Sequence, residues 1–572
     1  MRDLLGRLDV PGFDAGAYID RYRDNVSALP NIGMAFSGGG WRALINGAGV
    51  LKAADSRTPN ATNAGHIGGL LQASTYIAGL SGGNWLVGSV YMNNFSSVGN
   101  LQYDTTGQIW KFGNSILEGP PTGGIQLLST AAYYADLQDA VSGKRDAGFN
   151  TSITDYWGRA LSYQLINAPK GGPAYTWSPI AQSPGFQNAS QPFPISIADA
   201  RRPGERIISL NSSVYEFTPY EMGTWDSTTY GFVPTQYLGT NFSNGRVANQ
   251  SQCVVGFDNA GFVMGTSSSL FNILILQLNT TTNVPTLLRG ALETVLAGLG
   301  QDNNDIADYR PNPFYQWNVT GRSYNADARS LTLVDGGLDN QNIPFHPLIQ
   351  PVRNVDVIFA NDNSADTSTN WPNGSSLVTT YQRAMAPISN GTGFPSIPDT
   401  STFINLGLND RPTFFGCDAS NITLPTGSRQ NQAEVPLIVY LPNAPYNVMS
   451  NPPTLAATTN NSYRDAMILN GYNVATGGNA TIYKNWPQCL ACALLSRSFT
   501  RTGTPVPQAC QQCFTQYCWN GTVNSRAPGA YNPPLKLGQQ QQTNVTSSAA
   551  LLRPSNLIAI GFAVHALAAM MI

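Results

Sequence analysis

The order of apolar and polar residues predicts a strand, a tight turn and a helix near the start of the chain. Residues 31–36 form a short apolar run that ends at Ser37-Gly38-Gly39-Gly40. From Arg42 to Ala54 the chain is apolar enough for a buried helix. Glycines between two such elements favour a turn in which backbone segments approach each other closely.

The same pattern returns farther along the chain. Thr75–Ala78 is β-branched and aromatic, as expected of a strand, and Asn84–Met92 is apolar enough for a second buried helix. Gly79-Leu80-Ser81-Gly82-Gly83 lies between them. A third apolar run, Leu331–Val334, leads directly into Asp335-Gly336-Gly337. Functional residues of α/β sheets occur at such strand ends.

Two of these turns carry candidate chemistry. The segment 79–83 fits the pattern G-x-S-x-G, in which a serine, here Ser81, stands exposed on a strained turn between a strand and a helix. Gly38–Gly40 presents consecutive N–H groups at a helix start, and the guanidinium of Arg42 follows, which suits an oxyanion or a phosphate. Alone, each glycine motif is more often a structural turn, and Arg42 can be a paired surface residue. Together they indicate acyl transfer.

The identity of the general base stays open between two alternatives. The chain has three histidines, His66, His346 and His565. A carboxylate can replace histidine in a Ser–Asp dyad, and Asp335 is the best acidic candidate. A Ser81–Asp–His346 triad would also match the chain order of α/β-hydrolases. By itself, an Asp-Gly-Gly sequence most often forms a turn with no catalytic role.

Taken in order, Gly38–Ala43, Gly79–Gly83 and Val334–Gly337 resemble the patatin-like catalytic core of cytosolic phospholipase A2. Longer stretches are more similar to the fungal secreted lysophospholipases, also called phospholipase B: residues 36–52, 68–89, 335–351 and 355–377. The resemblance implies an α/β fold with a central mixed sheet, flanking helices and large insertions. It covers most of the chain.

The resemblance also implies roles for individual residues. Ser81 would be the nucleophile and Asp335 its base, with no catalytic histidine. Gly39 and Gly40 would supply the oxyanion N–H groups, and Arg42 would hold the substrate phosphate or steady the oxyanion. One departure is Leu338, where the family leads us to expect an acidic residue, although Asp339 follows it. No calcium-binding lipid domain is visible, so we expect action without a metal or other cofactor.

The expected reaction is hydrolysis of fatty-acyl esters of lysophospholipids and phospholipids through an acyl-enzyme. A broader carboxylester or acylglycerol lipase, or a lysolipid transacylase, is the alternative among acyl-transfer enzymes. The alternative from another class is a non-catalytic wall glycoprotein carrying a glycosylphosphatidylinositol (GPI) anchor.

Other residues near the motifs have structural alternatives. Asp362 and Asp366 can line the mouth of the site, but more often such residues cap a loop. Trp41 and Trp85 can contact acyl chains, but aromatic residues at such positions are more often core. His66, beside glycines, is expected to be structural or to line the glycine cradle.

Composition indicates a secreted glycoprotein. Charged residues make up only 11% of the 572 residues, below the usual share of about 25%. The net charge of −2 gives no electrostatic case for nucleic-acid binding. The sequence contains seventeen N-x-S/T sequons, some expected by chance, at Asn25, Asn60, Asn94, Asn150, Asn188, Asn211, Asn241, Asn249, Asn279, Asn318, Asn373, Asn390, Asn421, Asn460, Asn479, Asn520 and Asn544.

The seven cysteines allow two interpretations. Cys489-x2-Cys492-x17-Cys510-x2-Cys513 has the spacing of a four-cysteine zinc site, which would leave Cys518 over. In an oxidising compartment the same cysteines form disulfides, which we expect here. The odd total would also follow if one partner lay upstream of the given sequence.

The two ends of the chain suggest a secretory route. Leu557–Ile572 is almost wholly apolar, shorter than the roughly 20 residues of a membrane span, and follows small residues and a polar spacer, as in a GPI-attachment signal. A tail-anchor helix or a hydrophobic strand is the alternative. Residues 1–10 have no apolar signal core, so we expect a longer natural N-terminus.

These observations give the expected domain organisation. Residues 1–524 would form one catalytic domain, with core motifs at 32–92 and 331–377 and a cysteine-rich part at 489–518. Residues 100–330 are expected to be insertions and a lid around the core. Residues 525–548 would be a flexible tether containing the attachment zone 544–548, and 549–572 a GPI propeptide. The protein would lie outside the cell, at the plasma membrane or the wall.

Overall fold

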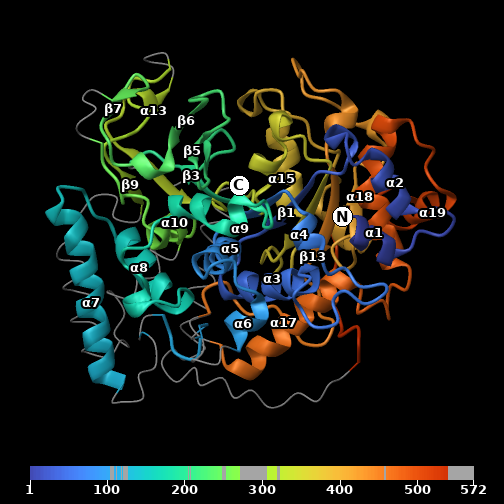
Figure 1. Cartoon of the computed structure of the whole chain (residues 1–572), viewed down its shortest axis with the longest axis horizontal. Helices are drawn as coiled ribbons and strands as arrows, with labels where there is room; N and C mark the ends of the chain where they lie inside the picture. The colour runs from blue at the N-terminus through green and yellow to red at the C-terminus, as the bar shows by residue number, and fades with distance from the viewer. Residues whose placement is uncertain are drawn as a thin grey trace.

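The computed structural model describes residues 1–103, 109–110, 112–116, 119, 126–203, 205, 208–247, 253–270, 306–318, 323–456 and 459–538. Its centre is one mixed sheet with the order β12-β13-β11-β1-β2-β3-β4-β5-β6, and β10 and β9 extend from β3 (Figure 1). The predicted α/β class with a central mixed sheet is confirmed. The strands are β1 (Ile32–Phe36), β2 (Tyr76–Gly79), β3 (Phe193–Ala200), β4 (Val214–Phe217), β5 (Glu221–Thr224), β6 (Gly231–Pro234), β9 (Ala307–Tyr309), β10 (Leu331–Asp335), β11 (Val357–Asp362), β12 (Thr413–Phe415) and β13 (Leu437–Pro442).

The parallel half of the sheet carries the first two sequence motifs, which follow β1 and β2. Strands β13, β11, β1, β2 and β3 are parallel neighbours, and nearly every residue in them is buried. Strands covered on both faces read as continuous apolar runs, which is why residues 31–36 were visible in the sequence. Residues 331–334 are equally buried, but they belong to β10, which pairs antiparallel with β3. Strands β4, β5 and β6 continue from β3 as antiparallel hairpins.

Helices make up much of the remaining described chain. They are α1 (Arg2–Leu8), α2 (Ala15–Tyr22), α3 (Gly40–Ala54), α4 (Leu70–Ala73), α5 (Gly82–Met92), α6 (Val98–Gln102), α7 (Gln126–Asp146), α8 (Ile153–Leu165), α9 (Pro184–Gln187), α10 (Ala260–Thr266), α13 (Tyr324–Asp327), α14 (Phe345–Leu348), α15 (Ser375–Ala384), α16 (Thr400–Asn405), α17 (Asn461–Thr476), α18 (Trp486–Thr502) and α19 (Gln508–Tyr517). Some of them, such as α5 and α18, contact the sheet directly. The two predicted helices are α3 and α5, and each begins two residues earlier than expected, inside its glycine turn.

Glycines let two helices from distant parts of the sequence meet at backbone distance. Helices α3 and α17 lie side by side below the sheet in Figure 1. A Cβ at Gly49 would lie 2.0 Å from Ile468 O, and a Cβ at Gly471 would lie 1.9 Å from Asn46 O. Neither position can hold a larger residue without separating the helices. The close packing of α17 therefore fixes the position of α3 and of the glycine turn at its start.

The segment expected to be an insertion contributes to the middle of the sheet. We expected residues 100–330 to surround the core, but β3 from this segment pairs with β2, β4 and β10. Its sequence, Phe-Pro-Ile-Ser-Ile-Ala-Asp-Ala, mixes proline and polar residues with apolar ones and gives only a weak strand pattern.

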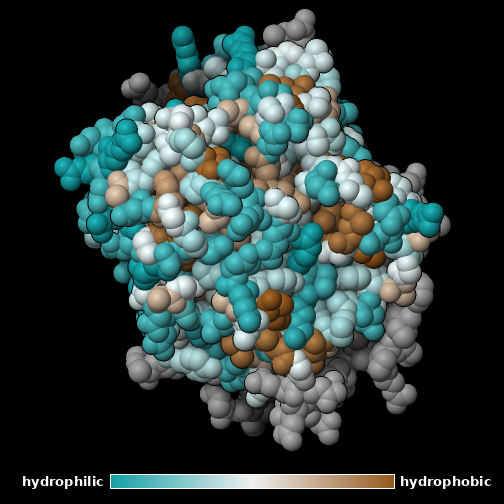
Figure 2. Space-filling view, turned by 90° about the vertical axis from the view of Figure 1, so that its right-hand side faces the viewer, coloured by the Kyte–Doolittle hydropathy of each residue, from teal (hydrophilic) through white to brown (hydrophobic). Residues whose placement is uncertain are grey.

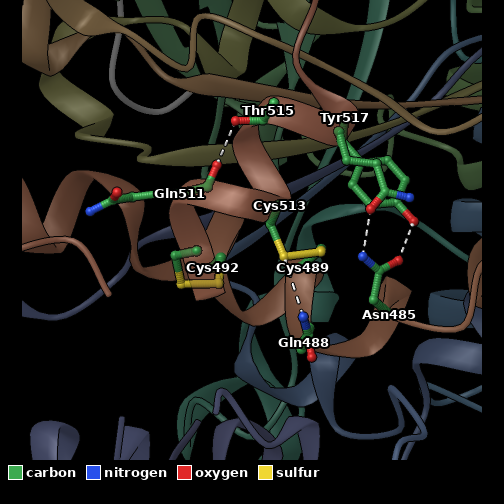
Figure 3. The surroundings of a disulfide bond; sticks show 10 residues. Asn485, Gln488, Cys489, Cys492, Gln511, Cys513, Thr515 and Tyr517 are labelled. Atoms are coloured by element: carbon green, nitrogen blue, oxygen red, sulfur yellow. Dashed lines mark hydrogen bonds between the residues drawn. A yellow bond between two sulfur atoms is a disulfide. The ribbon is translucent and has the colours of Figure 1, made fainter. Parts of the chain in front are cut away.

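Three disulfides join the C-terminal helices to each other and to the sheet. Cys489–Cys513 and Cys492–Cys510 link α18 to α19 (Figure 3), and Cys417–Cys518 links the end of α19 to the segment after β12. The disulfide interpretation is confirmed, and the pairing leaves no zinc site in these residues. Cys253 is exposed and not bridged.

The face drawn in Figure 2 is mainly hydrophilic, although the sequence has few charged residues. Separate hydrophobic patches lie among the hydrophilic residues of this face. Within the described ranges, no helix combines the length and apolar character needed to cross a membrane. Residues 539–572, which hold the predicted GPI signal, lie outside those ranges.

Part of the predicted tether lies against the domain. Lys536 N donates to Pro445 O and Leu537 N to Tyr446 O, at 3.0 and 2.8 Å. Tyr531 OH donates to Asp410 Oδ1 at 3.3 Å, and Lys536 Nζ contacts the same carboxylate at 2.8 Å. For residues 525–538 the structure therefore differs from a flexible tether, because aromatic and apolar side chains within a Pro-rich stretch find partners on the domain.

Candidate active site

Sheet topology explains how Ser81 and Asp335 meet although 254 positions separate them. Strand β2 runs parallel to β3 and ends with Gly79 paired to Ser196. Strand β10 runs antiparallel to β3 and ends with Asp335 paired to Ala198. The two strands approach each other along one edge of β3, so their ends are only two β3 residues apart.

Ser81 lies on a strained elbow at the end of β2. Its backbone has φ 50° and ψ −120°, a conformation that non-glycine residues rarely adopt. The flanking glycines are required by space: a Cβ at Gly82 would lie 2.2 Å from Gly40 O, and one at Gly83 would lie 2.2 Å from Phe36 O. The Ser81 side chain points to Asp335, and its Oγ donates to Asp335 Oδ2 at 3.1 Å.

Asp335 is buried and tuned as a proton acceptor. It is 3% exposed, and burial raises the pKa of its carboxyl group to about 6. Hydrogen bonds from Gly337 N–H, from Ser81 and from Leu270 N–H oppose the rise in this pKa, and the Gly337 bond to Oδ1 is 3.0 Å long. A carboxylate that gains a proton near neutral pH can act as a base toward a serine hydroxyl.

The glycine cradle lies beside the elbow. Gly38 N donates to Asn342 O at 3.0 Å, so this N–H is occupied. Among the described residues the N–H groups of Gly39 and Gly40 have no partner, and Gly40 N lies only 2.7 Å from the position of a Cβ at Gly82. Gly39 has φ 138°, which turns the backbone into α3. Two N–H groups at a helix start next to the nucleophile form a suitable oxyanion site.

The Arg42 side chain lies behind the glycine cradle, and of its two predicted roles this position favours steadying the oxyanion over holding a substrate phosphate. Its side chain is 1% exposed, and it donates to Asn363 O, Pro452 O and Thr454 Oγ1 at 2.8, 2.6 and 2.9 Å. Burial lowers the pKa of its guanidinium to about 10. In this arrangement the guanidinium holds loops together behind Gly39, whose Cβ position is 2.8 Å from Arg42 Nη2.

His346 is bound in a different cluster. Its Nδ1 contacts Arg383 Nη1 at 3.2 Å, its Nε2 lies 3.6 Å from Asp226 Oδ1, and burial lowers its pKa to about 4. Arg383 also donates to Asp226 Oδ2 at 2.7 Å. The hydrogen-bond partner of Ser81 Oγ is Asp335, so the geometry favours the dyad over the His346 triad.

The other candidates have structural contacts. Asp362 accepts from Ser364 N and Tyr440 OH, and Asp366 accepts from Asn373 N, as loop-capping residues do. His66 Nδ1 contacts Tyr472 OH at 3.3 Å. The rings of Trp41 and Trp85 pack together in the core with centroids 5.0 Å apart.

Two serines next to the dyad were not predicted from the sequence. Ser267 Oγ accepts from Ser81 N at 3.1 Å, and Ser269 Oγ accepts from Asp335 N at 2.9 Å. They follow α10 in a run of three serines. Such a run usually indicates only a loop, and nothing in its spacing points to two strand ends elsewhere in the chain.

Comparisons with known proteins show the family of this chain. A family model described as "Lysophospholipase catalytic domain" matches residues 32–524. A lysophospholipase from Penicillium chrysogenum is 55% identical over 565 residues, covering 98% of this chain and 90% of that protein. A lysophospholipase from Arthroderma benhamiae is 56% identical over 539 residues, covering 94% of this chain and 82% of that protein.

A solved structure shares the fold at low sequence identity. Human GIVD cytosolic phospholipase A2 matches with a TM-score of 0.60 and 17% identity, covering 87% of this chain and 66% of that chain. The matched family model describes a catalytic domain, which favours an enzyme over a non-catalytic glycoprotein.

Proposed function

The chain belongs to the family of lysophospholipase catalytic domains and is a lipid-ester hydrolase, and from this premise we propose that Ser81 and Asp335 carry out the hydrolysis. The observation that supports the proposal is the 3.1 Å hydrogen bond from Ser81 Oγ to the buried carboxylate. The proposed substrates of the enzyme are phospholipids and lysophospholipids.

In the acylation step Ser81 Oγ attacks the carbonyl carbon of the fatty-acyl ester. The hydroxyl proton passes to Asp335 Oδ2, and the carbonyl oxygen becomes an oxyanion that accepts hydrogen bonds from the N–H groups of Gly39 and Gly40. Each such donor contributes roughly 2.7–4 kcal/mol in other serine hydrolases. The intermediate then breaks its bond to the glycerol oxygen, which takes the proton from Asp335 and leaves as the deacylated lipid.

In the deacylation step a water molecule gives its proton to Asp335 and attacks the acyl-serine. The oxyanion of this second intermediate accepts hydrogen bonds from the same N–H groups. When the intermediate breaks its bond to Ser81 Oγ, this oxygen takes the proton back from Asp335 and the fatty acid leaves. One ester and one water give one acid and one alcohol, and the dyad returns to its starting state.

Arg42 supports the oxyanion site from behind. Its hydrogen bonds to Asn363 and to the 452–454 loop hold the backbone around Gly39, which has an unusual φ. A buried guanidinium that already donates hydrogen bonds to three oxygen atoms is better suited to stabilising this turn than to binding a phosphate in solvent.

We propose that the protein follows the secretory pathway, carries N-linked glycans and is held by a GPI anchor. The sequons, the disulfides of the described part and the apolar segment 557–572 support this location. Treatment of intact cells with phosphatidylinositol-specific phospholipase C should release the protein and its activity. Retention of the full amount on treated cells would contradict the anchor.

Substrate comparison tests the proposed reaction. Purified protein should release fatty acid from lysophosphatidylcholine faster than from a triglyceride, and Ser81→Ala should lose both activities by about 10³-fold or more. Diacylphosphatidylcholine as the main product would identify a transacylase instead, and faster triglyceride hydrolysis would identify an acylglycerol lipase.

A further inference from the structure

A short turn after α10 contacts both members of the dyad. Ser267 Oγ accepts from Ser81 N at 3.1 Å, and two residues later Ser269 Oγ accepts from Asp335 N at 2.9 Å. The N–H of Leu270 bonds to the Asp335 carboxylate. Ser267 and Ser269 are 0% and 2% exposed, so water does not compete for these bonds.

These contacts act at the point where the pairing of the two strands ends. Ser81 lies beyond the last paired residue of β2 and keeps a strained φ, and Asp335 is the last residue of β10. A strained residue keeps its conformation only where its surroundings determine it. One rigid turn that binds both N–H groups sets the distance between the two backbones, and proton transfer depends strongly on such a distance.

We propose that Ser267 and Ser269 are positioning residues that hold Ser81 and Asp335 at the separation required for proton transfer. This inference rests on the proposed dyad. The serine between them provides a matched control in the same turn. Ser268 Oγ donates to Met264 O at 2.8 Å and accepts from Trp157 Nε1 at 3.0 Å, so it serves α8 and α10 and not the dyad.

Steady-state kinetics on lysophosphatidylcholine test the proposal. Ser267→Ala and Ser269→Ala should lower kcat by about 10- to 100-fold. Their KM should change less than about twofold, because the hydroxyls do not contact substrate. Ser268→Ala, with the same loss of a buried hydroxyl, should keep kcat within about threefold. Ser269→Cys, which keeps a weak acceptor, should recover part of the loss.

The results separate three cases, with each variant's thermal unfolding measured alongside. If the two variants keep the kcat of wild type, the positioning role is wrong. If Ser268→Ala loses as much kcat as they do, or Ser269→Cys is no better than Ser269→Ala, general packing explains the effect and the proposal is overturned. If Ser81→Ala is active, the dyad itself fails, which is a different outcome.

A second, independent feature is a cavity at the end of the sheet opposite to the end that carries Ser81. Its volume is about 1050 Å³, and Gln350 and Gln430 in its wall precede β11 and β13. Ser81 and Asn363 follow the carboxyl ends of β2 and β11. The cavity therefore does not belong to the catalytic site.

The walls of this cavity suit a neutral sugar. Trp225, Tyr230 and Trp317 supply flat apolar rings, and Tyr230 is 54% exposed. The charges of Arg429 and Glu434 balance. The Arg353 guanidinium already lies 5.3 Å from the Trp225 ring centroid, which disfavours a cationic ligand.

The polar groups of the cavity also fit hydroxyl-rich ligands. Asn244, Gln350 and Gln430 supply amide side chains to the lining of the cavity. Ring faces with nearby amide groups bind the apolar face and the hydroxyl groups of a sugar ring.

The acceptor asparagines of two sequons, Asn318 and Asn390, lie in the same walls. Asn318 Nδ2 donates to Thr228 O at 3.1 Å and at a longer distance, 3.5 Å, to Ser227 O, beside Tyr230 and Trp317. Transfer of the glycan from a lipid-linked pyrophosphate donor forms a bond from the sugar carbon to Nδ2, breaks the bond from that carbon to the phosphate oxygen, and releases the lipid pyrophosphate and one amide proton. The second N–H of Asn318 remains for the bond to Thr228 O. We infer that the N-linked glycan carried by Asn318 folds back into the cavity and packs on Tyr230 and Trp317, an inference that rests on the proposed glycosylation.

Native deglycosylation tests this placement. The glycoprotein is treated with an endoglycosidase without denaturation, and site occupancy is followed by glycopeptide mass spectrometry. The glycan at Asn318 should be trimmed about 10-fold more slowly than the one at Asn60, an exposed sequon outside the cavity. Tyr230→Ala should remove most of this difference.

Three results would overturn the placement: an unoccupied Asn318, equal trimming at Asn318 and Asn60, or protection that survives both Tyr230→Ala and Trp317→Ala. If Asn60 is not occupied, Asn188 replaces it as the exposed reference. Hydrolysis of lysophosphatidylcholine should not change in Tyr230→Ala, so failure here is distinct from failure of the proposed reaction.

Discussion

At the scale of residues, Ser81 and Asp335 each carry a cost in stability. Ser81 has a left-handed φ of 50°, and Asp335 holds a carboxylate in a site that raises its pKa to about 6. Strain and buried charge of this kind are retained where the chemistry needs them. The sequence pointed to both residues through their glycine turns. It did not show Ser267 or Ser269, because hydroxyls that bind a distant backbone leave no periodic pattern.

The buried carboxylate makes a prediction about stability and pH. The pKa of Asp335 is about 6 in the folded chain, against about 3.9 unfolded, so its stabilising contribution is present below pH 4 and is lost as the pH rises through 6. Asp335→Asn removes this loss. The variant should gain about 2–3 kcal/mol of unfolding free energy over wild type between pH 4 and pH 7. Urea unfolding at both pH values measures the gain, and an equal difference at both would contradict it.

At the scale of elements, the helices and strands around the motifs were predictable because they are buried on all sides and strongly apolar. The long segment between the motifs was not, since β3 mixes proline and polar residues and yet holds β2 and β10 together. The cysteine spacing allowed both zinc and disulfides. Only the packing of α19 on α18 decides between them, because it places the sulfur atoms in bonded pairs.

The disulfide with the largest sequence separation, 101 residues, should be the most stabilising. Closing a loop of about 100 residues is worth up to about 4.7 kcal/mol in the chain-entropy model. The double variant Cys417→Ser/Cys518→Ser should therefore lose about 3–5 kcal/mol of unfolding free energy. The matched control Cys253→Ser, at an exposed unbridged cysteine, should stay within about 0.5 kcal/mol. Similar losses in both variants would show that the bridge is not the cause.

At the scale of the whole molecule, distant parts of the chain meet around the sheet. Helix α17 packs on α3 through Gly471 and Gly49, and residues 525–538 return to the domain at Pro445 and Tyr446. The composition of this last segment suggested a tether. A Pro-rich segment forms few regular elements, and its contacts depend on partners that only the fold supplies.

Truncation measures how much residues 525–538 contribute to the stability of the domain. A chain that ends at Asn524 loses the bonds of Tyr531 and Lys536 to Asp410 and of Leu537 to Tyr446. It should be less stable than a chain that ends at Gly538 by about 2 kcal/mol, as expected for a few partly buried hydrogen bonds. Identical thermal unfolding of the two chains would instead support a flexible tether.

The most direct test of the dyad compares kcat/KM for lysophosphatidylcholine in two variants that remain folded. Asp335→Asn removes the proton acceptor of Ser81, and His346→Asn keeps an acceptor for Arg383 in the neighbouring cluster. The dyad predicts a fall of about 10³-fold or more for Asp335→Asn and less than about threefold for His346→Asn. An equally steep fall for His346→Asn, with both variants folded, would contradict it.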